Sequence, residues 1–152
     1  MSAHRVAVIA CSGAKLDHTA PAAQLYTGSL FRSSLLAAEA LQVAGQLDQV
    51  VVLSALHGLV AIDQELDPYD VTWGHPLQVN VHQLAAQLVE LGPLDGQLQL
   101  LPMLPKAYAL QLHQAAHLAG AWVVQLANPL ADARGLLSMR RTLRELREAA
   151  AL

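Results

Sequence analysis

Three side chains in this sequence are of types that support acid–base or nucleophilic chemistry, and each lies in a polar stretch after an apolar run. Lys15 follows the apolar run 6–10 and could neutralise a phosphate or, when partly desolvated, act as nucleophile or base. His57 follows the apolar run 48–53 and can act as acid, base or hydrogen-bond donor near neutral pH. Asp70 could act as a general base or stabilise the oxocarbenium-like centre formed when a glycosidic bond breaks.

A second set of side chains is suited to binding. Tyr26 offers a ring face for stacking a base and a hydroxyl for fixing it. Ser29 stands where a helix should begin, so it could cap that helix or lie beside an anion held at the helix N-terminus. Cys11 is either a thiolate nucleophile or a small buried residue. The remaining candidates for substrate contact are Ser12, Ser54, Gly58 and Tyr69.

Basic residues gather at the end of the chain. A helix over residues 135–150 would place Arg140, Arg144 and Arg147 together on one face, where they could contact a nucleic-acid backbone. The alternative is a solvated face with ion pairs four residues apart, between Arg144 and Glu148 and between Arg141 and Glu145.

The elements that must position these groups alternate along the chain. Strands are predicted over 6–10, 48–53, 97–101 and 121–126, and helices over 29–44, 76–91, 105–119 and 135–150. Residues 11–28 and 54–73 are predicted to be loops. Residues 1–152 should therefore form a single α/β domain with a three-layer, Rossmann-like fold and a mostly parallel sheet of about four strands. The loops after the first two strands would meet at one sheet edge.

Composition narrows the class of protein. The chain has 152 residues, is 54% apolar and 14% charged, and carries a net charge of −3, which excludes a uniformly basic nucleic-acid binder. No apolar run is long enough to span a membrane, and no signal-peptide core precedes the first strand, so a cytoplasmic protein is expected. A single cysteine excludes an internal disulfide and gives no zinc signature. We expect no metal and no cofactor, and the oligomeric state stays open.

Several motifs resemble known families. The segments 6–15, 25–32, 53–60 and 67–70 together resemble a small bacterial and phage family that consists of a domain of unknown function. Leu53-Ser-x-x-His57-Gly-Leu followed by Pro68-Tyr69 also looks like the peroxide-stress protein YaaA family, in which a tyrosine usually stands at the His57 position.

A further resemblance lies in the order Cys11, Lys15, Tyr26, Ser29, which is similar to archaeosine synthase and its transglycosylase relatives. Here residues 16–25 intervene between the lysine and the tyrosine, and Arg32 stands where those relatives carry a histidine. These resemblances imply a protein that binds or acts on modified or damaged nucleic-acid bases. YaaA-type proteins are associated with DNA binding and oxidative damage, and related domains have been proposed as DNA glycosylases.

The leading hypothesis is a DNA glycosylase-like enzyme that takes a base into a crevice between the loops after the first two strands. Tyr26 would stack on the base, and its edges would be hydrogen-bonded by Ser12, Ser29 and Ser54. Asp70 would stabilise positive charge on the sugar or position water, while His57 would donate to the leaving base. Lys15 would hold a phosphate or attack the sugar carbon. The alternatives are a non-catalytic DNA-binding stress-response protein and an enzyme acting on free nucleotides or nucleosides.

Overall fold

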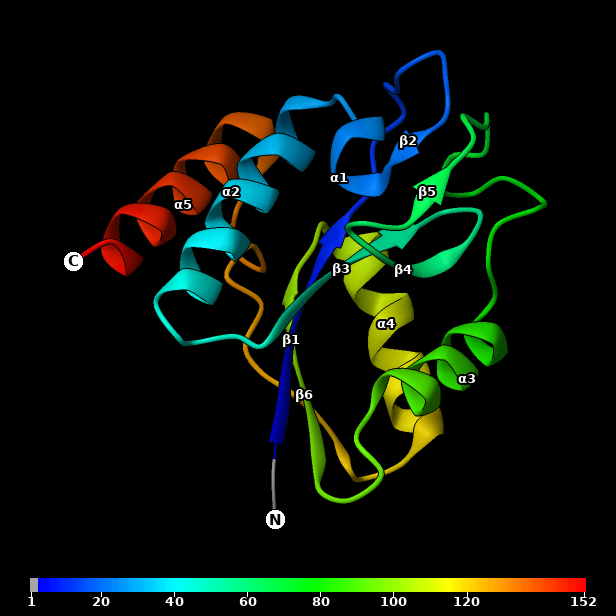
Figure 1. Cartoon of the computed structure of the whole chain (residues 1–152), viewed down its shortest axis with the longest axis vertical. Coiled ribbons are helices and arrows are strands. Elements are labelled where there is room, and N and C mark those ends of the chain that lie inside the picture. Colours follow the sequence, from blue (N-terminus) through cyan, green and yellow to red (C-terminus); the bar gives the residue numbers. More distant parts are fainter. Residues whose placement is uncertain (1–2) are drawn as a thin grey trace.

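The apolar runs of the sequence form a mixed sheet of five strands, in the order β4-β3-β1-β6-β7, in the computed structural model, which describes residues 3–152 (Figure 1). Its strands are β1 (Ala3–Ala10), β3 (Gln49–Ser54), β4 (Gly58–Ala61), β6 (Gln97–Met103) and β7 (Val123–Gln125). Strands β3, β1, β6 and β7 run parallel, as predicted, and β4 pairs antiparallel with β3. About four strands were expected, and the sheet has five. The additional strand is β4, which forms because a tight turn after β3 brings the chain back antiparallel to β3.

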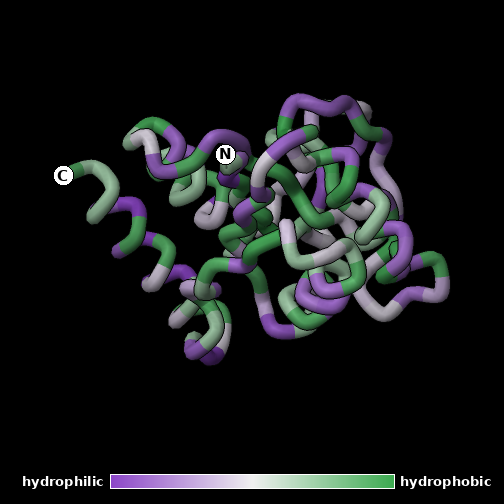
Figure 2. The backbone as a smooth tube through the Cα atoms, turned by 90° about the horizontal axis from the view of Figure 1, so that it is seen from below, coloured by the Kyte–Doolittle hydropathy of each residue, from purple (hydrophilic) through white to green (hydrophobic). Residues whose placement is uncertain are grey.

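Helices cover both faces of the sheet. On one face lie α2 (Ser29–Val43) and α5 (Gly135–Ala150), and on the other lie α3 (Val81–Leu91) and α4 (Lys106–Ala119) (Figure 1). Side chains of β1 alternate between two buried cores, with Ala7 and Ile9 facing α2 and with Val6 and Val8 facing α3 and α4. Hydrophobic and hydrophilic segments alternate along α5 in Figure 2, as expected of a helix with one solvated face. None of the helices described between residues 3 and 152 has the length and apolar character needed to cross a bilayer.

The third helix begins later than the sequence suggested. Pro76 was expected at its first position, but α3 starts at Val81 and its N-cap is Asn80. The Asn80 side chain accepts a hydrogen bond from the Gln83 backbone N–H at 2.8 Å, and the Gln83 side chain accepts one from the Asn80 backbone at 2.9 Å. This reciprocal pair satisfies two backbone donors at the helix start, so it specifies the beginning of the helix more strongly than an upstream proline does.

The two stretches predicted to be loops contain short elements instead. Residues 11–28 include β2 (Ala20–Pro21) and α1 (Ala22–Leu25), and residues 54–73 include β4 and β5 (Glu65–Leu66). Strand β2 pairs antiparallel with β5. Within the first stretch the chain also folds back on itself, since Lys15 and Tyr26 form an isolated antiparallel bridge. These pairings tie the segment after β1 to the segment after β4 at one edge of the molecule.

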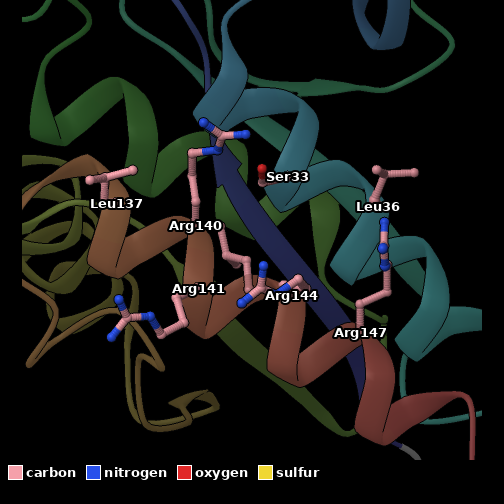
Figure 3. A pocket seen from close by; sticks show the side chains of 8 residues that line it. Ser33, Leu36, Leu137, Arg140, Arg141, Arg144 and Arg147 are labelled. Carbon is pink, nitrogen blue, oxygen red and sulfur yellow. The ribbon is translucent and has the colours of Figure 1, made fainter.

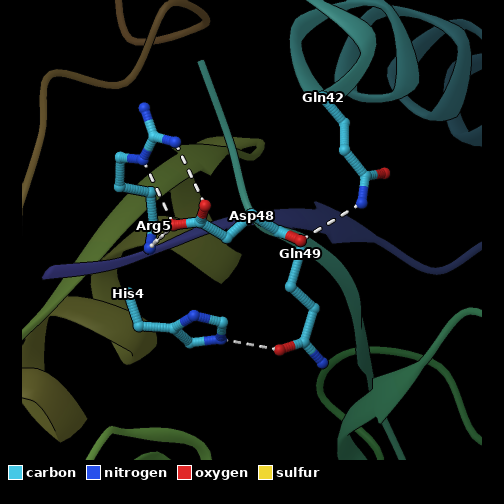
Figure 4. Close-up of polar contacts among 5 residues, drawn as sticks. All are labelled: His4, Arg5, Gln42, Asp48 and Gln49. Carbon is cyan, nitrogen blue, oxygen red and sulfur yellow. Dashed lines mark hydrogen bonds and ion pairs between the residues drawn. The ribbon is translucent and has the colours of Figure 1, made fainter. Parts of the chain in front are cut away.

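The opposite end of β1 is held by polar contacts to the start of β3 (Figure 4). The Arg5 guanidinium donates to both carboxylate oxygens of Asp48 at 3.1 Å, and the Arg5 backbone N–H donates to the same carboxylate at 2.8 Å. Beside this pair and between the same two strands, His4 Nε2 lies 2.8 Å from Gln49 Oε1. The β1–β3 register is thus fixed at the amino ends of the strands, which leaves their carboxyl ends free to carry polar loops.

Candidate functional site

Four polar and aromatic residues surround Tyr69 near the carboxyl ends of β1 and β3. The Lys15 Nζ lies 4.3 Å from the centre of that ring, and the His57 ring contacts it edge-on, with centroids 5.1 Å apart. The Tyr69 Oη is hydrogen-bonded to Tyr26 Oη at 2.5 Å and to Ser54 Oγ at 2.6 Å. We refer to Lys15, Tyr26, Ser54, His57 and Tyr69 as the tyrosine cluster.

The sheet brings these residues together because parallel strands end at the same edge. Ser54 is the last residue of β3, and the Cys11 backbone N–H donates to the Leu53 carbonyl at 3.2 Å, which continues the β1–β3 ladder past the end of β1. Lys15 lies in the segment just beyond Cys11. The Lys15–Tyr26 bridge then fixes the ammonium group next to the buried phenol, with Lys15 Nζ 5.8 Å from the Tyr26 ring centre.

The turn that carries His57 is braced by Gln87 of α3, a residue that sequence reasoning missed. Gln87 Nε2 donates to the His57 carbonyl at 2.8 Å, and the Leu59 N–H donates to Gln87 Oε1 at 2.8 Å. Gly58 lies between them with a φ of +74°, and a Cβ there would collide with the Gln87 amide. Turn geometry and this close approach therefore account for glycine at position 58, which the sequence suggested as a substrate contact.

A second aromatic pair, also missed from the sequence, lies beside Cys11. The rings of Trp73 and Tyr108 are stacked with centroids 4.1 Å apart, and the Tyr108 hydroxyl lies 3.7 Å from Cys11 Sγ. Cys11, Trp73 and Tyr108 are all half-buried. Tyr26, Tyr69 and Tyr108 are the only three tyrosines of the chain. This low number is the one feature of the sequence that could have pointed to all three as site residues.

Burial controls the protonation of the site. It raises the pKa of Tyr26, Tyr69 and Tyr108 above the usual value for a phenol, so all three hydroxyls keep their hydrogen at neutral pH. Partial burial lowers the pKa of His57, which favours the neutral imidazole. The Lys15 ammonium is the charged member of this cluster. In the described chain, residues 3–152, no group of three or more His, Cys, Asp or Glu side chains is placed to hold a metal ion.

The other predicted contact residues lie outside the tyrosine cluster. Ser12 Oγ donates to the Ala14 carbonyl at 2.6 Å and accepts from the Gly28 N–H at 3.2 Å, so it holds the loop before α2. Of the two roles considered for Ser29, the helix cap was wrong: Gly28 is the N-cap, no side chain caps the helix, and Ser29 is exposed at the first helical position. Asp70 is exposed and makes no hydrogen bond or ion pair within residues 3–152.

The C-terminal arginines form a separate feature. A hollow of about 480 Å³ lies between α2 and α5 (Figure 3), and its lining consists of Ser33, Leu36, Leu137, Arg140, Arg141, Leu143, Arg144 and Arg147. We call it the arginine hollow. The expected pairs of Arg144 with Glu148 and of Arg141 with Glu145 do not form: no acidic group of the described chain lies within ion-pair distance of the four arginines. All four are exposed, where water makes such pairs weak.

Comparison with known proteins gives one family match and no match among curated proteins. The matching model is described as a family of unknown function, DUF6884, and it aligns with residues 6–133. That span contains the tyrosine cluster, Trp73 and Tyr108, and it ends before α5 and the arginine hollow's basic residues. Because the match covers most of the 152 residues of the chain, the chain belongs to this family of unknown function, DUF6884.

Proposed function

We propose that this protein is a nucleobase-directed enzyme that holds a modified or damaged base of DNA against the tyrosine cluster and hydrolyses its N-glycosidic bond. The observation that carries the proposal is the convergence of Lys15 and His57, from the segments after two different strands, on the ring of Tyr69. The carboxyl edge of parallel strands is where Rossmann-like folds bind their ligands, and we propose that classification for this sheet. The motif resemblance to the YaaA and archaeosine synthase families favours a base as the ligand.

Aromatic side chains supply the binding surface in this proposal. A base that has left the stack of its helix needs flat apolar faces and a few polar contacts at its edge. Trp73 and Tyr108 offer such faces next to Cys11, and both are only partly buried. Stacking on an aromatic ring is worth about 1–3 kcal/mol per base, whichever base is bound. The polar groups of the tyrosine cluster then decide which base is accepted.

The charged and titratable groups supply the chemistry. Water would add to C1′ of the sugar while His57, which burial keeps neutral, accepts a proton from it. The electrons of the broken C1′–N bond leave with the base, which is then protonated by solvent. Asp70 would stabilise positive charge on the sugar from its exposed position, as its carboxylate is free of protein partners within residues 3–152. This assigns His57 the part of a base, whereas the sequence suggested an acid.

Lys15 has two roles open to it, and its contacts favour one. Its Nζ donates to the Gly13 carbonyl at 3.3 Å and lies over the face of the Tyr69 ring, so the group is placed as a hydrogen-bond donor. We therefore assign Lys15 to holding a phosphate oxygen. A nucleophilic Lys15 would instead form an imine with the opened sugar, which borohydride reduces to a stable adduct. The chain has only one other lysine, Lys106, so Lys106→Ala is the matched control for Lys15→Ala in that trap.

The decisive experiment incubates the purified protein with DNA and RNA oligonucleotides that carry diverse lesions and natural base modifications, and it measures released bases and abasic sites. Release is expected from at least one modified substrate, with a large loss for Lys15→Ala, His57→Gln and Asp70→Asn and little change for Lys106→Ala. If no substrate releases a base, or if release survives substitution of Lys15 and His57, the proposed activity is wrong.

A second candidate function, nucleic-acid binding without catalysis, is favoured by the arginine hollow. Four arginines without acidic partners in the described chain line one hollow, and such a cluster attracts phosphates and releases counterions. Nucleic-acid binding would then weaken as the salt concentration rises and in the variant Arg144→Glu, and it would be unchanged by Asp70→Asn. Arg134 does not line the hollow, so the control Arg134→Glu should weaken binding less. Thermal protection by free nucleotides but not by duplex DNA would point to a small-molecule enzyme instead.

A further inference from the structure

The hydroxyl hydrogens of the tyrosine cluster can be assigned by counting donors and acceptors. Ser54 Oγ accepts the Leu56 N–H at 3.2 Å and the His57 N–H at 3.0 Å. A serine hydroxyl has two acceptor lone pairs and one hydrogen, so both lone pairs are occupied. The third contact of Ser54, to Tyr69 Oη at 2.6 Å, must therefore use the serine's own hydrogen. Ser54 donates and Tyr69 accepts.

Burial determines to which atom the Tyr26 hydroxyl donates its hydrogen. Tyr26 is fully buried, with 0% exposure, and its hydroxyl is hydrogen-bonded to Tyr69 Oη at 2.5 Å. Ser54, the other hydroxyl that interacts with it, has both lone pairs occupied and cannot accept its hydrogen. If Tyr69 donated across this contact, the Tyr26 hydrogen would be left in the core without an acceptor, which is strongly unfavourable. Tyr26 therefore donates to Tyr69 as well.

Tyr69 Oη consequently receives two hydrogens, one from Ser54 and one from Tyr26, and its own hydrogen is directed elsewhere. Tyr69 is only partly buried, unlike both of its donors. Lys15 Nζ lies over the same ring, and the His57 ring lies against it. Accepting two hydrogen bonds polarises the remaining O–H and makes it a better donor. Burial raises the pKa of this phenol, so it keeps that hydrogen at neutral pH.

We propose that the Tyr69 hydroxyl donates a hydrogen bond to a carbonyl oxygen of the bound base, so that the site selects oxo bases over amino bases. This inference rests on the function proposed above and names its substrate class. An amino group at the same position would set two donors against each other and leave the Tyr69 O–H unpaired, a mismatch that discriminates strongly between ligands. The hydrogen bond would also stabilise the negative charge that builds on the oxo group as the C1′–N bond breaks.

The test compares oxo and amino members of matched pairs, uridine with cytidine and inosine with adenosine, by calorimetric binding to the 152-residue protein. We expect the wild type to bind the oxo member of at least one pair about tenfold more tightly, the size of one net hydrogen bond. Tyr69→Phe should lose that preference by weakening the oxo nucleoside alone. Thr142→Val, which removes a hydroxyl that bonds only within α5, should keep it.

The other outcomes of this comparison decide between failure of the Tyr69 assignment alone and failure of the proposed function. If Tyr69→Phe does not fold, Ser54→Ala removes one of the two donors to Tyr69 and should reduce the oxo preference. Equal binding of both members of each pair, a preference that survives Tyr69→Phe, or a preference that Ser54→Ala leaves undiminished overturns the assignment of Tyr69. When base release from DNA persists without such a preference, only this assignment fails. Absence of both release and nucleoside binding overturns the proposed function together with it.

Discussion

Lys15 Nζ lies 4.3 Å from the centre of the Tyr69 ring, although the two residues belong to segments that are far apart in the chain. The contact depends on the small β2–β5 sheet, which joins the segment after β1 to the segment after β4. A lysine ammonium over an aromatic face is attracted by the ring electrons, by about 0.5–2 kcal/mol depending on exposure. The relationship is the structural basis for treating the two segments as one site.

Removing the Tyr69 hydroxyl should destabilise the protein more than removing the Tyr26 hydroxyl. Tyr69→Phe leaves the hydrogens of Ser54 and Tyr26 without an acceptor in the core, at a cost of about 2–5 kcal/mol in the free energy of unfolding. Tyr26→Phe removes one donor and leaves no hydrogen stranded, at a cost of about 1 kcal/mol. Urea denaturation of both variants measures the difference. A larger loss for Tyr26→Phe would mean that the hydroxyl chain runs in the opposite direction.

Gln87→Ala should loosen the turn that carries His57. The substitution leaves the His57 carbonyl and the Leu59 N–H without their partner, with an expected loss of about 1–3 kcal/mol in the free energy of unfolding. Glu90→Ala, an exposed change on the same helix, should stay within about 0.5 kcal/mol of the wild type. Hydrogen exchange of the Leu59 amide should accelerate in Gln87→Ala only. Unchanged exchange would show that the turn does not depend on this brace.

The Arg5–Asp48 pair predicts a specific loss of stability in acid. Hydrogen bonding from Arg5 lowers the pKa of Asp48 to about 2, below its value in an unfolded chain. A lowered pKa means that the contribution is complete above the unfolded value of about 4 and disappears as the pH falls toward the folded value. The difference in Tm between wild type and Asp48→Asn should therefore shrink across that interval. A difference that is constant with pH would contradict the pairing.

His57 should titrate below the usual range of histidine in the folded protein. Partial burial disfavours the imidazolium, so the folded pKa lies below that of the unfolded chain, about 6.5. The stability that His57 contributes is complete above that pH and decreases as the pH falls through it toward the folded value. NMR titration of the His57 ring carbons, in buffer and in concentrated urea, checks the direction. A midpoint that is higher in buffer than in urea would contradict it.

Much of the sheet and of the helical layers could be predicted from the sequence because buried parallel strands are continuous apolar runs. Residues 6–10 and 48–53 correspond to β1 and β3, and α5 occupies the predicted residues 135–150. The predicted start of α3 was wrong because the prediction gave more weight to proline at position 76 than to the Asn80–Gln83 capping box. Strands β2 and β5 are two residues long, too short for any periodicity to be visible.

The candidate site was predictable to the extent that it follows strand ends. Lys15 and His57 were expected in one place for that reason, and both contact the ring of Tyr69. Contacts made between distant segments could not be derived from spacing, which is why the Trp73–Tyr108 stack and the Gln87 brace were missed. Whether these residues bind a base stays a prediction.

The most direct test of the central claim, that the tyrosine cluster binds a nucleobase, is an NMR titration of protein with labelled tyrosine and tryptophan rings against millimolar nucleosides. The account predicts that at least one nucleoside shifts the ring resonances of Tyr69 and Trp73 in a saturable way. It also predicts no shift for Trp122, whose ring lies at the other end of the sheet beside Gly92. Saturable shifts confined to Trp122, or no shift with any nucleoside, would contradict it.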